Sequence, residues 1–331
     1  MPNPYISGTG FYLPPRVVTN DELSSYMDTT DEWIQERTGI KERRYVEKGV
    51  GPSDLAIPAT EQALKAAGLT VSDIDFIIFA TSTPDFYAPG SGCVLQEKMG
   101  FNEIGALDIR VQCSGFIYGL SIAEQYIRTG NFKNILLIGA EVQSTAMNLT
   151  DEGRDTAIIF GDGAGAAIIS ATEENKGILS THMHSEGKYL KELWLEAPAS
   201  NAGHPRITRE VLDEGKQYLK MNGKEVFRHA ITRFPEVINE ALEANNLTSE
   251  NINLLIPHQA NLRITQMVQK RLGLSNDQVF SNIHKYGNTT AATIPIALAE
   301  ALNEGRIKDG DLLVLAAFGA GFTWASAIMK W

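Results

Sequence analysis

The sequence predicts an α/β protein built from two related halves. From Leu55 onward, apolar stretches of strand length alternate with stretches that have the spacing of amphipathic helices. Residues 61–78 (EQALKAAGLTVSDIDFII) also match residues 239–256 (NEALEANNLTSENINLLI) at seven positions, with an offset of 178. Because this similarity covers a helix, a turn and a strand, we expect two duplicated units, 1–175 and 176–331, packed about a pseudo-twofold axis.

Two further similarities support the duplication. The motif F-G-x-G occurs at Phe160 and again at Phe318. A third match has an offset of 175, which a change of loop length explains, and it pairs Gly130 with Gly305, Lys133 with Lys308, and Cys113 with Asn288.

The N-terminal part of the first half predicts several short elements. A strand, a Pro-Pro turn and a helix capped by Thr19 or Asn20 come first. A short helix then carries Trp33 and Arg37 and ends at Gly39. Next follow a helix over 55–68, an apolar strand over 75–83, a loop, and a helix through Cys93.

The segment 106–130 (ALDIRVQCSGFIYGLSIAEQYIRTG) begins as a strand and continues as a helix that Gly130 ends. After the strand 134–141, the Gly-rich stretch 160–170 leads into another apolar strand. It is not a phosphate-binding P-loop, because no Lys and no helix follow the glycines. Residues 185–220 are polar and predict a surface excursion.

Composition excludes several classes of function. The chain has 331 residues, of which 43% are hydrophobic, and a formal net charge of −11, which disfavours nucleic-acid binding. No signal-peptide pattern and no apolar run of membrane-spanning length occur, so we expect no membrane association. Cys93 and Cys113 have no paired spacing, which indicates the reducing cytoplasm, and no metal-ligand spacing is found.

Cys113 lies where the strand of segment 106–130 gives way to the helix. A thiol at the first turn of a helix is close to the positive end of the helix dipole, which favours the thiolate. The alternative is a small core residue, which is the commoner role of a buried cysteine.

His258 and Asn288 are candidate partners for this cysteine. His258 follows a buried strand, and groups that bind or react gather beyond the carboxyl ends of such strands. Asn288 begins the helix that matches the Cys113 helix. Each of the two residues has an alternative role: Asn288 can be a plain N-cap, and His258 can be a structural residue. A Cys–His–Asn set supports acyl transfer through the thiol, and the lack of an Asp or Glu partner for His258 favours carbon–carbon chemistry over hydrolysis.

Six motifs in order make the whole chain similar to the β-ketoacyl-acyl carrier protein synthase III family, the initiating condensing enzymes of bacterial fatty acid synthesis. They are DEWIQERTGI, CSGFIYGL, FGDGAGAA, PHQANLRI, YGNTTAA and AFGAGFTWAS. The resemblance implies a thiolase-like five-layer αβαβα fold, a homodimer, and no cofactor beyond the CoA thioester substrate.

The resemblance also implies a mechanism. An acyl-CoA primer acylates Cys113, and malonyl-acyl carrier protein then loses CO2. His258 and Asn288 stabilise the resulting carbanion, and the backbone N–H groups of Cys113 and Ala320 form the oxyanion hole. Ala320 stands where the family commonly has Gly.

Two binding surfaces follow from the same resemblance. Trp33 and Arg154 are expected to hold the adenine of CoA, and Arg37 its phosphates. A basic patch is expected to receive the acidic carrier protein. Its residues are Arg228, Gln259, Ala260, Asn261, Leu262, Arg263, Lys270 and Arg271.

Three differences from the family leave open which acyl group the primer carries. Val111 and Gln112 replace small residues before the nucleophile, Ala88 stands where a bulky aromatic residue is common, and the excursion over 200–217 is longer. We expect Ala88, Val111 and Gln112 to shape the acyl pocket. Alternatives to the initiating synthase are a condensing enzyme of secondary metabolism with a larger acyl substrate, a non-catalytic dimer partner, and, least favoured, a Cys–His–Asn hydrolase.

Overall fold

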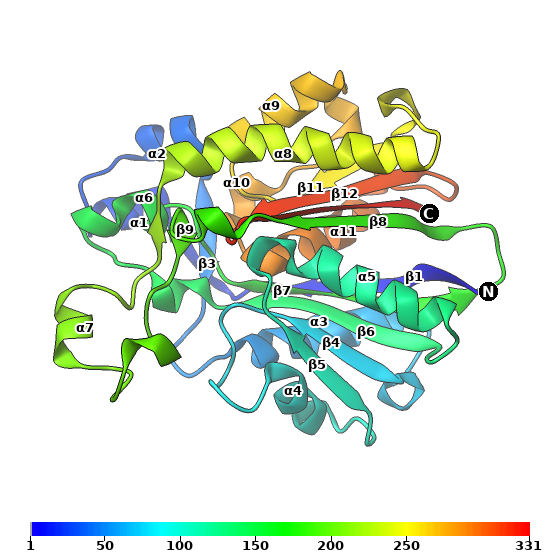
Figure 1. Ribbon diagram of the computed structural model, residues 1–331, viewed down its shortest axis with the longest axis horizontal. Coiled ribbons are helices and arrows are strands. Elements are labelled where there is room, and N and C mark those ends of the chain that lie inside the picture. Colours follow the sequence, from blue (N-terminus) through cyan, green and yellow to red (C-terminus); the bar gives the residue numbers. More distant parts are fainter. Residues whose placement is uncertain (1) are drawn as a thin grey trace.

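Two large β-sheets are stacked with helices between them (Figure 1). The computed structural model describes residues 2–331. The first sheet has the strand order β1-β7-β6-β4-β5, with β1 (Asn3–Tyr12), β4 (Phe76–Ala80), β5 (Gly105–Ile109), β6 (Asn134–Glu141) and β7 (Gly163–Thr172). The second has the order β11-β12-β13-β8, with β8 (Gly177–Ser185), β11 (Leu254–Pro257), β12 (Leu312–Gly319) and β13 (Thr323–Lys330).

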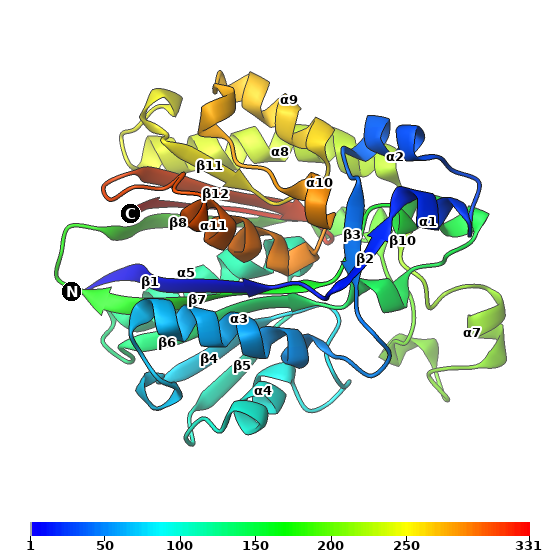
Figure 2. The ribbon, with the colours of Figure 1, turned by 180° about the vertical axis from the view of Figure 1, so that it is seen from behind.

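The helices complete a five-layer αβαβα arrangement, as expected (Figures 1 and 2). α3 (Pro52–Ala67) and α4 (Ser91–Met99) cover the outer face of the first sheet. α5 (Gly115–Arg128) and α11 (Thr293–Asn303) fill the middle layer, where Phe116, Leu120 and Leu298 belong to one buried cluster. α8 (Gly223–Ala244) and α9 (Leu262–Leu272) cover the second sheet.

The two sheets have the same topology, although their sequences share few residues. β6 pairs in parallel with β4 and antiparallel with β7, and β12 pairs in the same senses with β11 and β13. β1 and β8 then pair antiparallel with β7 and β13. Val279 forms an isolated parallel bridge with Leu255 at the place that β5 occupies in the first sheet. The chain crosses from one sheet to the other between Thr172 and Gly177, and we keep 1–175 and 176–331 as the proposed halves.

The two central helices start alike but have different lengths. A 3-10 turn precedes each of them, η2 (Gln112–Ser114) before α5 and η9 (Thr290–Ala292) before α11, and both turns begin with a residue of positive φ. The residue numbers of the two turns are offset by 178, whereas those of Gly130 and Gly305, which follow the helices, are offset by 175. The offset falls by three because α11 has 11 residues and α5 has 14. The pairing of Cys113 with Asn288 is therefore wrong: Ala291 is the counterpart of Cys113, and Asn288 precedes the turn.

Local sequence accounts for most elements. β4 and β6 are almost wholly buried and read as continuous apolar runs, as strands covered on both faces do. α2 (Asp31–Thr38) begins at the Thr30 cap and ends at Gly39, whose φ of 76° favours glycine. Within residues 2–331, no helix is long and apolar enough to span a membrane.

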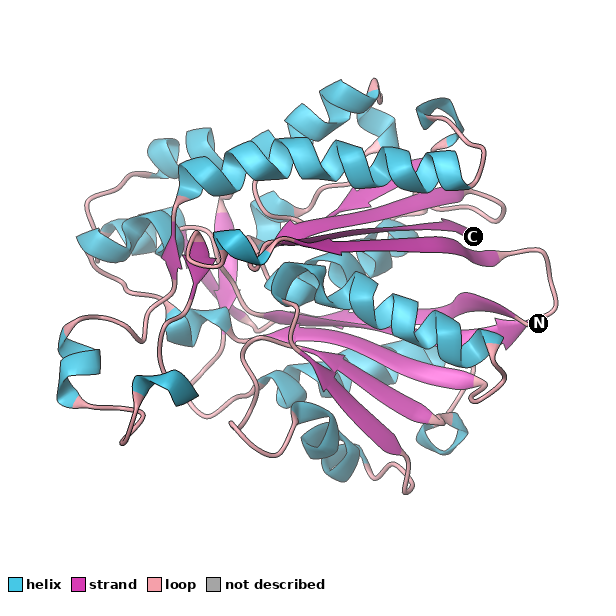
Figure 3. Cartoon of the chain, viewed as in Figure 1, coloured by secondary structure: helices cyan, strands magenta, loops and turns pink. Residues whose placement is uncertain are grey.

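The smaller elements gather at one end of the two sheets (Figure 3). They are β2 (Arg16–Thr19), α1 (Asn20–Ser24), β3 (Glu42–Tyr45), α6 (Arg154–Ala157), β9 (Leu193–Trp194), α7 (Arg209–Asp213), β10 (Lys220–Met221) and α10 (Ile283–Tyr286). β9 and α7 lie in the polar excursion that the sequence predicts over 185–220, and β10 ends one residue beyond it.

Candidate active site

Cys113 is held between the two halves of the chain. Its side chain is 5% exposed, in the 3-10 turn between β5 and α5. A Cβ atom built on Gly319, at the end of β12, would lie 2.5 Å from Cys113 Cβ and 2.8 Å from Sγ. The second sheet therefore contacts the thiol through backbone that has no room for a side chain.

Burial controls the protonation of this thiol. Desolvation, together with the nearby Glu141 carboxyl, raises the pKa of Cys113 to about 12. The backbone N–H groups of Ala320 and Cys113 act in the opposite direction, because they donate hydrogen bonds that favour the thiolate. The expected helix-induced thiolate is thus wrong for the free protein, since the desolvation of a buried charge outweighs the dipole of a helix end.

His258 follows β11 directly and is 2% exposed. Its backbone N–H donates to the Ala316 carbonyl at 2.7 Å, which anchors it to β12. Its ring Nδ1 lies 2.6 Å from the Thr293 hydroxyl, whereas the buried Nε2 has no hydrogen-bond partner among the described residues. Desolvation lowers the pKa of His258 to about 3, so the imidazole is neutral at physiological pH.

Asn288 is held by its own backbone. It forms a parallel bridge with Phe160, its N–H donates to the Ile159 carbonyl at 2.9 Å, and its carbonyl accepts from Gly161 N–H at 3.1 Å. Its side-chain Oδ1 accepts from Thr290 N–H at 2.8 Å. This bond fixes the amide so that Nδ2 is the end that remains available to donate.

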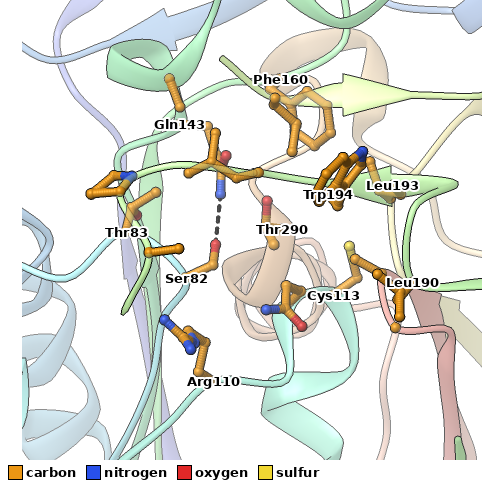
Figure 4. Close-up of a pocket in the computed structure, with 18 of the residues that line it drawn as sticks. Ser82, Thr83, Arg110, Cys113, Gln143, Phe160, Leu190, Leu193, Trp194 and Thr290 are labelled. Carbon is orange, nitrogen blue, oxygen red and sulfur yellow. Dashed lines mark hydrogen bonds between the residues drawn. The ribbon is translucent and has the colours of Figure 1, made fainter. Parts of the chain in front are cut away.

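Two cavities meet at Cys113. The smaller cavity, of about 110 Å³, is lined by Cys113, His258 and Asn288 together and extends between Phe227 of α8 and Asn261 at the start of α9. The larger cavity, of about 410 Å³, shares Cys113, Phe160 and Leu193 with the smaller one (Figure 4). Ala320 and Thr290 line this larger cavity. The structure thus brings the three candidate catalytic residues to one cavity and gives the thiol a second space.

The predicted nucleotide-binding residues also lie together, on α2 and α6. The guanidinium of Arg37 lies 4.2 Å from the centre of the Trp33 ring, and that of Arg154 lies 4.8 Å from it. Arg154 also donates to the Asp28 carbonyl at 2.6 Å. An aromatic ring with two guanidinium groups close to it combines an apolar surface with positive charge.

The predicted basic patch divides into surface and interior residues. Arg228, Arg263, Lys270 and Arg271 are exposed on the adjacent helices α8 and α9. Gln259, in contrast, is 1% exposed. Its amide donates to the Pro257 carbonyl and accepts from the Ser281 hydroxyl, so a surface role for Gln259 is wrong and it holds the interior of the loop instead.

The other three residues of this patch lie at the start of α9. Ala260 and Leu262 are half-buried. Asn261 caps α9 by accepting from Arg263 N–H at 2.8 Å, and its amide donates to the Arg37 carbonyl at 2.9 Å. It therefore ties the patch to the predicted nucleotide site.

Of the residues expected in the acyl pocket, Gln112 lines the larger cavity and the other two do not. Val111 and Ala88 are absent from its wall, and Ala88 is exposed, whereas its neighbour Tyr87 lines the cavity. Gln112 reaches the cavity because its φ of 46° turns the chain sharply just before Cys113. The position of Ala88 is expected to act from the partner subunit, so the roles of Ala88 and Val111 in the acyl pocket stay predictions.

Sequence reasoning missed four residues that surround the reacting groups. Glu141 is fully buried, accepts hydrogen bonds from Ser82 and Thr83, and has its pKa raised to about 7 by desolvation. Thr293 contacts His258, Gly319 contacts Cys113, and Arg110 lines the larger cavity. A charged residue at the end of the apolar strand β6 was the one available signal for Glu141, and Gly319 lies in a repeated motif. No local sequence pattern indicated a role for Thr293 or Arg110.

The described chain contains neither a disulfide nor a metal-binding cluster. Both Cys93 and Cys113 are free thiols. Across residues 2–331, no group of three or more His, Cys, Asp or Glu side chains is arranged to hold a metal ion.

Comparisons with known proteins agree on one family. The family model described as 3-oxoacyl-[acyl-carrier-protein (ACP)] synthase III matches residues 107–187, and the model of its C-terminal part matches residues 242–331. The β-ketoacyl-[acyl-carrier-protein] synthase III of Caldanaerobacter subterraneus is 46% identical over 326 residues, which cover 98% of this chain and 97% of the relative.

Solved structures give the same result. The crystal structure of 3-oxoacyl-[acyl-carrier-protein] synthase III from Aquifex aeolicus has 41% identity and a TM-score of 0.90, and the match covers 99% of this chain and 100% of that one. The priming β-ketosynthase of the R1128 polyketide biosynthetic pathway has 30% identity and a TM-score of 0.91, with 99% and 96% covered.

Proposed function

Because this chain belongs to the 3-oxoacyl-[acyl-carrier-protein] synthase III family, we propose that it is the acyltransferase that initiates fatty acid synthesis. It joins an acyl-CoA primer to malonyl-acyl carrier protein by decarboxylative Claisen condensation. The observation that carries the proposal is the smaller cavity, whose wall contains Cys113, His258 and Asn288 together. We further propose a homodimer in the cytoplasm and no cofactor beyond the CoA thioester.

In the first step, Cys113 Sγ attacks the thioester carbonyl of the acyl-CoA. The tetrahedral oxyanion receives hydrogen bonds from the backbone N–H groups of Cys113 and Ala320, which already face the sulfur. The carbon–sulfur bond to CoA then breaks, and the thiol proton of Cys113 leaves with CoA. Since burial raises the pKa of Cys113 to about 12, the thiol must lose its proton during attack rather than before it.

In the second step, the malonyl thioester loses CO2 and forms an enolate. A neutral His258 that carries its proton on Nε2 and the Nδ2 group of Asn288 donate hydrogen bonds to the enolate oxygen. The unpartnered, buried Nε2 supports this role, because it has no competing partner among the described residues. The enolate carbon attacks the acyl-cysteine carbonyl, the new carbon–carbon bond forms, and the Cys113 thiolate leaves and regains a proton.

The remaining assignments concern binding. The stacked set of Trp33, Arg37 and Arg154 would hold the nucleotide of CoA. The smaller cavity opens between α8 and α9 near the exposed basic residues Arg228 and Arg263, so an acidic carrier protein docked there would have its prosthetic arm beside the thiol.

A condensing role in secondary metabolism is the second candidate. It is favoured by the likeness to the R1128 priming ketosynthase, but that protein is 30% identical whereas the Caldanaerobacter synthase is 46% identical. The choice between the two depends on the primer, which the larger cavity selects.

Labelling with radioactive acyl-CoA tests the proposed function. The purified protein should incorporate label at Cys113, and Cys113→Ala should lose both labelling and condensation, whereas the matched Cys93→Ala variant should keep both. His258→Ala should be acylated normally but condense slowly. Absence of labelling with every short or medium acyl-CoA would contradict the proposal, and equal loss of both steps in His258→Ala would contradict the division of roles.

A further inference from the structure

The larger cavity has one polar and one apolar side. Leu193, Trp194 and Leu219 form part of the apolar side. Arg110 and Ser82 lie on the opposite side, and Cys113 lies on the side of Leu193 and Trp194, as Figure 4 shows. The cavity therefore offers a bound chain polar groups, among them the exposed Arg110, as well as an apolar surface.

Arg110 gives this cavity a positive charge. It is the one lysine, arginine, aspartate or glutamate among the residues that line it. It follows β5 directly, three residues before Cys113, and within residues 2–331 it forms no salt bridge to a carboxylate. Its guanidinium can therefore accept an anion from a ligand without breaking an existing ion pair.

A second, independent observation points to a polar ligand. The Thr290 side chain is 3% exposed and lines the cavity, yet its hydroxyl has no hydrogen-bond partner among the described residues. A buried hydroxyl without a partner costs about 1–3 kcal/mol, which a polar atom of a bound acyl chain would offset.

Glu141 does not pair with Arg110, although it lies behind the polar side. Ser82 Oγ donates to its carboxyl at 2.9 Å, Thr83 Oγ1 at 2.6 Å and Gln143 Nε2 at 3.2 Å. These three bonds all reach Oε2, whereas Oε1 accepts from the Ser82 N–H at 3.1 Å. Gln143 also donates to Ser82 Oγ at 2.9 Å (Figure 4). The cluster is internally satisfied and leaves Arg110 as the free charge of the wall.

We propose that the larger cavity selects acyl primers that carry a carboxylate at the far end of the chain, with Arg110 as the residue that binds it. This inference rests on the proposed function. Arginine suits the task because its planar guanidinium can form two parallel hydrogen bonds to a carboxylate. The methylene groups between the thioester and the carboxylate would contact the apolar side at Leu193 and Trp194. The substrate class is therefore the mono-CoA thioesters of short dicarboxylic acids.

Matched pairs of primers test the inference. Succinyl-CoA is compared with butyryl-CoA, glutaryl-CoA with pentanoyl-CoA, and adipyl-CoA with hexanoyl-CoA, each with malonyl-acyl carrier protein. In at least one pair, kcat/KM should favour the dicarboxylic thioester by about tenfold or more, as expected for a hydrogen bond between charged groups. Arg110→Met should abolish this preference and leave turnover of the uncharged partner within about threefold of wild type, an effect below 1 kcal/mol.

Arg209→Met is the matched control, because Arg209 is exposed on α7 and is absent from both cavity walls. It should keep the wild-type preference, and thermal unfolding should show that both variants are folded. If the uncharged thioester is preferred in all pairs, the inference is overturned while the proposed function stands. A preference that survives in Arg110→Met overturns the assignment of Arg110. If no thioester labels Cys113, the proposed function fails, and the inference fails with it.

Discussion

Replacement of Thr293 by valine should separate the two halves of the reaction. The Thr293 hydroxyl lies 2.6 Å from His258 Nδ1 and 3.0 Å from the Thr290 carbonyl, and its single proton can go to only one of them. If His258 is to donate from Nε2, the hydroxyl must donate to Nδ1. Thr293 is then a positioning residue that sets which ring nitrogen carries the proton.

The magnitude follows from burial. Thr293 and His258 are both 2% exposed, so the loss of the hydroxyl leaves Nδ1 without water or another partner. A buried polar group left unsatisfied costs about 1–3 kcal/mol. If that cost falls on the Nε2-protonated form, condensation should slow by about tenfold to a hundredfold. Acylation of Cys113 should change by less than about threefold, because it does not use His258.

Single-turnover labelling by acyl-CoA measures the first step, and CO2 release from malonyl-acyl carrier protein with an acylated enzyme measures the second. Thr293→Ser keeps the hydroxyl and should retain most of the wild-type rate. In a His258→Ala background, Thr293→Val should have almost no further effect on condensation, since the partner is already absent. A folded Thr293→Val protein that condenses within about twofold of wild type would refute the reasoning.

Three further predictions concern Gly319, Trp33 and Glu141. Gly319→Ala would place a Cβ 2.8 Å from Cys113 Sγ. The rate of acylation should therefore fall by more than about a hundredfold, and the free energy of unfolding by about 1–3 kcal/mol. Normal labelling of Cys113 in this variant would contradict the prediction. Trp33→Ala should raise KM for acyl-CoA about tenfold with little change in kcat, because the stacking surface is lost; an unchanged KM in initial-rate assays would argue against a nucleotide site there. Glu141 has a folded-state pKa of about 7 against an ordinary value of 4.5, so the folded state binds more protons between these pH values and wild-type stability should fall as pH rises through this window. Relative to Glu141→Gln, urea unfolding of wild type should therefore lose about 3 kcal/mol between pH 4.5 and pH 8, and a constant difference would refute the pKa shift. The opposite contribution of His258, whose lowered pKa of about 3 makes stability rise between pH 3 and 6.5, is present in both proteins and cancels.

Local patterns predicted the frame of the fold correctly. The apolar runs of β4 and β6 indicate buried strands. The glycines after α2 and α5 indicate where these helices end, because glycine adopts a positive φ more readily than other residues. The internal repeat predicted two related halves, and their sheets share the same strand pairing apart from β5, which has only an isolated bridge as its counterpart. The same patterns placed Cys113 after β5 and His258 after β11, where the ends of strands leave side chains free to react.

The errors arose where long-range contacts outweigh local ones. A helix N-terminus favours a thiolate at Cys113, but desolvation by burial and the carboxyl of Glu141, which is distant in sequence, raise the pKa instead. The resemblance placed Gln259 in the surface patch for the carrier protein, but hydrogen bonds with Pro257 and Ser281 hold it inside. The pairing of Cys113 with Asn288 failed because α11 is shorter than α5.

The sequence by itself thus determined the α/β class, the duplicated halves, and the positions of Cys113 and His258, because each depends on the order of residues within one element. Only the tertiary structure decided the environment of the reacting groups. Thr293 beside His258, Gly319 against Cys113, and Arg110 in the wall of the larger cavity are brought there by packing. Desolvation and cavity shape depend on everything that surrounds an atom, and segments far apart in the chain supply most of those surroundings.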